Sequence, residues 1–116
     1  MKVNPLVLVS TVSLMFLPPL GAAQAFECPK HFAKAQAAID KVSGDMKGGM
    51  SKKMRKEDMA LVHALLDDAK SHLASAKHNH QKPQGRFDHA RAIAKADAAR
   101  AYANAADLFH FKLMAM

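Results

Sequence analysis

The spacing of apolar residues between positions 59 and 76 most narrowly limits the folds open to this chain. Successive steps of three and four residues separate them, which is the pattern of a helix that buries one face against other helices. Strand-like alternation is absent, and Ala, the best helix former, fills 20 of the 91 positions from Phe26 onward. The sequence therefore predicts an all-α protein. The spaced residues are Met59, Val62, Leu66, Ala69, Leu73 and Ala76.

Glycine and proline divide the chain after Phe26 into three predicted helices. The segment 78–85, which reads HNHQKPQG, is predicted to be a loop between the second and third helices. Short connections favour antiparallel neighbours, so we expect an up-and-down bundle of three helices. The predicted helices run from about Pro29 to Asp45, from about Arg55 to Lys77 and from about Arg86 to Phe111.

The first and third predicted helices each carry an apolar face that would pack against the second. The face of the third is mostly Ala in its middle, which allows helices to approach closely. The face of the first consists of Phe32, Ile39, Val42 and Met46, and the face of the third consists of Phe87, Ala90, Ala94, Ala98, Tyr102, Ala105 and Phe109.

Residues 1–25 have the pattern of a cleavable signal peptide. Lys2 precedes an apolar run from Leu6 to Leu17, and Ala23-Gln24-Ala25 is a small-x-small cleavage pattern. The apolar run of about 12 residues is too short to cross a hydrocarbon core of ~30 Å as a helix. We therefore predict a periplasmic or secreted domain of residues 26–116, with no membrane span after cleavage.

Composition and motifs exclude several classes of function. Without Lys2 the chain has 16 Lys+Arg and 10 Asp+Glu, a net charge of +6. Export and the dispersal of the basic residues argue against a nucleic-acid partner. A single Cys excludes an intramolecular disulfide framework and any CxxC motif. No HExxH, GxSxG or GxxxxGK[ST] motif is present, so we predict that the protein is not an enzyme.

An antiparallel bundle would gather the His, Cys and Met residues at its two ends. Imidazole suits copper, zinc and nickel, whereas thiolate and thioether favour Cu(I). The His-x-His pair in the predicted loop could turn both rings toward one ion, and three Met residues step by four. The candidate ligands are Cys28, His31, Asp68, His72, His78, His80 and His89 at one end, and Met46, Met50, Met54, His63 and His110 at the other.

Each candidate ligand also has a structural interpretation. The i,i+4 pairs Asp68–His72 and His63–Asp67 can be charge pairs that only stabilise a helix. Met side chains often fill irregular cores, and Cys28 can be a thiol that links two copies.

The segment from Leu65 to Lys77, followed by a His-containing loop and a helix that opens near His89, resembles the small metal-binding proteins of the bacterial periplasm. The resemblance implies a short, exported, His-rich helical bundle that binds copper and other divalent ions. This chain departs from that family in having fewer His, several Met, one Cys and three predicted helices rather than four.

Two function hypotheses follow, ranked ahead of a third in which the basic protein binds an anionic surface of the cell envelope. The first is an exported protein that binds metal ions, above all copper as Cu(I) or Cu(II), with zinc or nickel as alternatives, for storage, buffering or handover. The second is a non-enzymatic helical module of the cell envelope that forms a homodimer or binds a partner protein. Metal binding should depend on pH because protons compete for imidazole, whereas helix association should depend on protein concentration.

Overall fold

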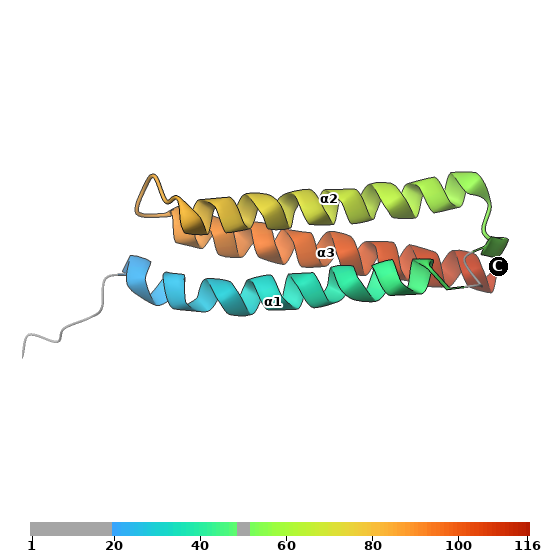
Figure 1. Cartoon of the computed structure of the whole chain (residues 1–116), viewed down its shortest axis with the longest axis horizontal. Helices are drawn as coiled ribbons and strands as arrows, with labels where there is room; N and C mark the ends of the chain where they lie inside the picture. The colour runs from blue at the N-terminus through green and yellow to red at the C-terminus, as the bar shows by residue number, and fades with distance from the viewer. Residues whose placement is uncertain (1–19, 49–51) are drawn as a thin grey trace, which may run out of the picture.

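The computed structural model describes residues 20–48 and 52–116, with side chains from Glu27 onward. It contains three helices, α1 (Leu20–Met46), α2 (Lys56–Gln81) and α3 (Asp88–Ala115). They lie side by side and alternate in direction (Figure 1). No strand occurs in these two ranges. The prediction of an all-α bundle of three up-and-down helices is confirmed.

The core forms along the predicted seam of α2. Five of the six seam residues are buried, and Met59 is half-buried. Ile39 and Val42 of α1 are also buried, with Ala35 beside them. Phe32 and Met46, at either end of this face of α1, pack against the core while partly exposed. The buried seam residues are Val62, Leu66, Ala69, Leu73 and Ala76.

The predicted buried face of α3 is wrong. Phe87, Tyr102 and Phe109 are exposed, whereas five of the seven buried residues of α3 are Ala. The larger Leu, Val and Ile side chains of α1 and α2 fill the interior, so only small side chains fit where α3 approaches both helices. The aromatic rings consequently lie on the outer surface. The buried residues of α3 are Asp88, Ala92, Ala96, Ala99, Ala103, Ala106 and His110.

Helix α2 continues one turn further than predicted. Residues 78–81 are helical, and the Lys82 amide donates to the carbonyl oxygen of His78 at 2.9 Å. The helix ends at Gln81 because a residue before proline, here Lys82, disfavours the α conformation. The prediction that His78 and His80 lie in a flexible loop is therefore wrong.

Helix α1 begins at Leu20 and has Pro29 inside it, whereas the sequence predicted a start near Pro29. Residues 1–19 lie outside the described part of the chain, and cleavage after Ala25 stays a prediction. Among the helices of the described part, none combines the length and apolarity needed to cross a bilayer.

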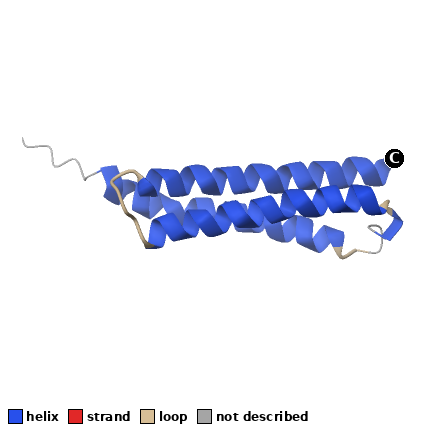
Figure 2. Ribbon diagram, turned by 90° about the horizontal axis from the view of Figure 1, so that it is seen from above, coloured by secondary structure: helices blue, strands red, loops and turns tan. Residues whose placement is uncertain are grey.

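The topology brings three chain segments to one end of the bundle. The beginning of α1, the end of α2 and the beginning of α3 lie together there (Figure 1). From above, the connection between α2 and α3 is seen to lie at this same end (Figure 2). Residues from positions near 28, 80 and 89 can therefore meet.

Candidate metal centre

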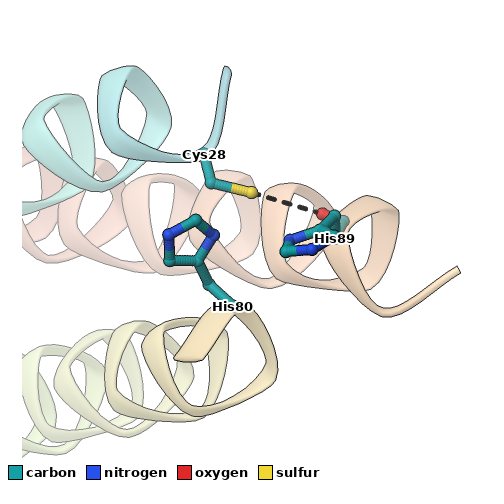
Figure 3. Close-up of side chains that lie close together, drawn as sticks. All are labelled: Cys28, His80 and His89. Carbon is teal, nitrogen blue, oxygen red and sulfur yellow. Dashed lines mark hydrogen bonds between the residues drawn. The ribbon is translucent and has the colours of Figure 1, made fainter. Parts of the chain in front are cut away.

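Three metal-ligating side chains meet at this end, and each comes from a different helix. Cys28 belongs to α1, His80 to the last turn of α2 and His89 to the first turn of α3. One ligand atom from each residue lies within 4.8 Å of the other two. The side chain of Cys28 points toward the space between the two rings (Figure 3).

The two imidazole rings pack edge to face. Their centroids are 5.3 Å apart and their planes are inclined by 70°. The ring of Phe32 on α1 meets the His80 ring in a second edge contact, with centroids 5.5 Å apart. These contacts fix the position of His80 between an apolar ring and the second imidazole.

The Nδ1 atoms of both histidines are buried and have no hydrogen-bond partner. A buried polar atom left unsatisfied costs about 1–3 kcal/mol. Buried histidine nitrogens are ordinarily hydrogen-bonded, so two unsatisfied nitrogens in one cluster require an explanation. A cation that both nitrogens ligate would satisfy them, because neutral imidazole nitrogen is a metal ligand.

Cys28 is fully buried, and its thiol lies 3.6 Å from the carbonyl oxygen of His89, to which it donates. Burial raises the pKa of this thiol, because the thiolate loses its hydration, although a backbone hydrogen bond partly offsets that shift. At neutral pH the thiol of the metal-free protein therefore carries its proton. A metal ion must displace this proton in order to bind the sulfur.

The spacing of the three donors is slightly wider than a filled site requires. Bonds of about 2.0–2.1 Å to nitrogen and 2.3 Å to sulfur place tetrahedral ligands about 3.5 Å apart. The observed limit of 4.8 Å is therefore about 1 Å too wide. The donor atoms would have to move closer together by about this distance for all three to bind one ion.

The predicted pairing of His78 with His80 on one ion is not supported. Both residues lie in α2, where a separation of two positions turns the side chains about 200° apart around the axis. His78 is exposed and lines a separate hollow with Lys82 and Arg91. Only His80 reaches the cluster.

The other candidates at this end have different surroundings. The Nδ1 atom of His31 pairs with a carboxylate oxygen of Asp97 at 2.6 Å. The ring of His72 stacks on Tyr102, with centroids 5.0 Å apart and planes inclined by 13°. Asp68 is exposed. None of these three belongs to the cluster.

The candidates at the methionine end lie in varied surroundings. Met46 and Met54 pack against the core, while Met50 lies outside the described residues. His63 is exposed, and His110 is buried beside Met114 in the wall of a hollow between α1 and α3. In the described ranges, Cys28, His80 and His89 form the one group of three or more Cys, His or acidic donors. A thioether site stays a prediction.

Sequence reasoning missed two neighbours of the candidate ligands. It assigned Phe32 only to the core, and it did not consider Asp97 as the partner of His31. The aromatic contact of Phe32 follows from its position four residues after Cys28, on the same side of α1. No sequence signal relates Asp97 to His31, because 66 residues separate them.

Comparison with known protein families, curated proteins and solved structures found no match for this chain. The Cys/His group is therefore interpreted from its own geometry.

Proposed function

We propose that this protein binds a metal ion through Cys28, His80 and His89 and handles copper in the periplasm or outside the cell. The observation that carries the proposal is the meeting of three donors from three helices, with both histidine Nδ1 atoms buried and unsatisfied. Chance surface proximity of His and Cys would leave these atoms hydrated.

The donor set supports copper over harder ions. A thiolate with two imidazoles is typical of trigonal copper sites, and thiolate favours Cu(I). The same donors also suit zinc, which is the principal alternative. Carboxylates, which calcium and magnesium prefer, are absent from the cluster.

The proposed location rests on the signal-peptide pattern of residues 1–25. Membership among the small His-rich periplasmic metal-binding proteins is part of the same proposal, supported by the segment from Leu65 to Lys77. The role is non-enzymatic: the ion is stored, buffered or handed on.

The direct test is titration of the metal-free protein with Cu(I), Cu(II), Zn(II) and Ni(II), with the stoichiometry read for each. We expect one tight ion per chain, with Cu(I) held most tightly. The variant Cys28→Ser/His80→Gln/His89→Gln should no longer bind this one tightly held ion. Unchanged binding in this variant, with its helicity retained, would contradict the proposal.

A second function has one specific observation in its favour. Leu108 and Phe111, near the end of α3, are 53% and 72% exposed, and Phe87 is 63% exposed. Exposed large apolar residues are common at protein–protein contacts. If the chain acts as an interaction module, its sedimentation should depend on concentration and remain independent of metal.

A further inference from the structure

The candidate centre contributes three donors, one per helix. In the described part of the chain, no fourth His, Cys, Asp or Glu joins this group. His31 lies one helical turn after Cys28, but its Nδ1 atom is held by Asp97 at 2.6 Å. The nearest candidate on α1 is therefore already paired.

The number of protein ligands distinguishes two kinds of metal site. Structural zinc sites are closed by four protein ligands, whereas catalytic zinc sites with three protein ligands keep a fourth position for an external molecule. Trigonal copper sites of two His and one Cys likewise have an axial position, which a further and weaker ligand fills. By this criterion the cluster belongs to the second kind. An ion bound there would have a coordination position that the protein does not fill.

The burial of the three residues indicates where that position lies. Cys28 is fully buried, and Phe32 covers His80 while packing against the core. His80 and His89 keep part of their surface exposed, although their Nδ1 atoms and Cys28 are buried. We expect an external donor to approach past these two rings, at the end of the bundle where α2 connects to α3.

From this arrangement we infer that the centre, given the metal binding proposed above, holds its ion together with one external sulfur or nitrogen donor of the kind that Cys and His side chains carry. The protein and the external donor share the ion in a ternary complex. Such a complex is the intermediate of ligand exchange, so the site suits handover of the ion more than long-term storage.

The test uses the full chain loaded with Co(II), whose visible and thiolate charge-transfer bands report its coordination. Imidazole and 2-mercaptoethanol are added separately while equilibrium dialysis follows bound cobalt. We expect either donor to change the bands with a stoichiometry of one, while cobalt stays on the protein. Only 2-mercaptoethanol should also increase the intensity of the thiolate charge-transfer band, which distinguishes its binding from that of imidazole.

His31→Ala is the matched control for a hidden fourth protein ligand. The variant should have the donor-free spectrum of the parent and the same response to imidazole. A changed donor-free spectrum in His31→Ala would overturn the inference, because His31 would then be the fourth ligand.

Three further outcomes show whether the inference fails alone or together with the proposed function. Thiolate–cobalt bands that neither donor alters would overturn the open position and leave the metal site intact. Loss of cobalt to the donor, without a ternary spectrum, would also overturn it. Absence of any thiolate–cobalt band would overturn both the inference and the proposed function.

Discussion

The imidazole rings of His80 and His89 meet edge to face with their centroids 5.3 Å apart, although they belong to different helices. Nine positions separate them along the chain, and the α2–α3 connection reverses the chain between them. Cys28 completes the group from α1. An ion bound by all three would therefore link the three helices at one end of the bundle.

This linkage predicts that metal stabilises the fold. A ligand that binds only the folded protein at a hundredfold excess over its Kd adds about 2.7 kcal/mol. We expect the Tm to rise with Zn(II) or Cu(I) in the parent and to rise clearly less in Cys28→Ser. Calorimetric scans with and without metal measure both. An equal shift in the variant would show that the ion binds elsewhere.

His80 and His78 form a matched pair for mutagenesis, because they occupy different faces of one helix turn. His80→Gln removes a ligand and should weaken metal affinity at least about tenfold, since loss of a residue that only orients a ligand already costs about 10–100-fold. His78→Gln should leave the affinity unchanged within about twofold, since second-site effects are small for a residue outside the cluster. Isothermal titration of both variants tests the assignment. An equal loss of metal affinity in both variants would indicate that His78 and His80 bind the same ion.

Metal affinity should rise with pH. The pKa of Cys28 is raised by burial, so below that pKa the thiol is protonated and each bound ion releases its proton. The cysteine alone should then strengthen binding about tenfold per pH unit through the neutral range. Titration calorimetry in buffers with different ionisation enthalpies measures the released protons. Cys28→Ser should release about one proton fewer per ion; identical release would exclude sulfur as a ligand.

The stability of the fold should also depend on pH, through the ionisation of Asp88. Its carboxylate accepts hydrogen bonds from the Gln84 amide and from Arg91. The Gln84 hydrogen bond is the main reason that the pKa of Asp88 lies below its usual value. The ionised carboxylate of Asp88 therefore stabilises the fold fully above its unfolded-state pKa of about 3.9. This stabilisation is lost as the pH falls through the lower pKa that Asp88 has in the folded protein.

Asp88→Asn should consequently be less stable than the parent at pH 7, and the difference should shrink at acidic pH. Urea denaturation at several pH values measures it. A difference that does not vary with pH would show that ionisation of Asp88 contributes nothing.

The alanine face of α3 predicts an intolerance of larger side chains. Ala103 has no exposed surface, and adding three carbon atoms there should destabilise the bundle by about 1–3 kcal/mol. Ala103→Leu is compared with Ala101→Leu, because Ala101 is exposed on the same helix. The control should change stability by less than about 0.5 kcal/mol. Equal effects would mean that α3 does not pack closely at this face.

The methionine hypothesis has its own test. Thioethers bind Cu(I) without competition from protons, so a site of Met46, Met50 and Met54 should retain Cu(I) at about pH 5. Replacing all three by Leu preserves apolar volume and should remove only this acid-resistant binding. Retention of Cu(I) at low pH by the Leu variant would mean that these side chains serve the core alone.

The apolar spacing of α2 determined its buried face, because a period near 3.6 residues is compatible with one helix orientation only. Alanine content, glycine and proline likewise determined three helices, and the short connections determined their antiparallel order. That order was sufficient to place Cys28, His80 and His89 at one end of the bundle. Local sequence rules predict such features because they depend on residues close together in the chain.

Only the tertiary structure decided which residues at that end meet. The orientation of α3 depended on the fit of its alanines against the large side chains of α1 and α2, and this fit turned Phe109 outward and His89 inward. Because α2 continues as a helix through residues 78–81, the side chains of His78 and His80 lie on different faces of it. His31 is hydrogen-bonded to Asp97 on α3. These outcomes depend on packing between residues distant in sequence, so the periodicity of a single helix could not predict them.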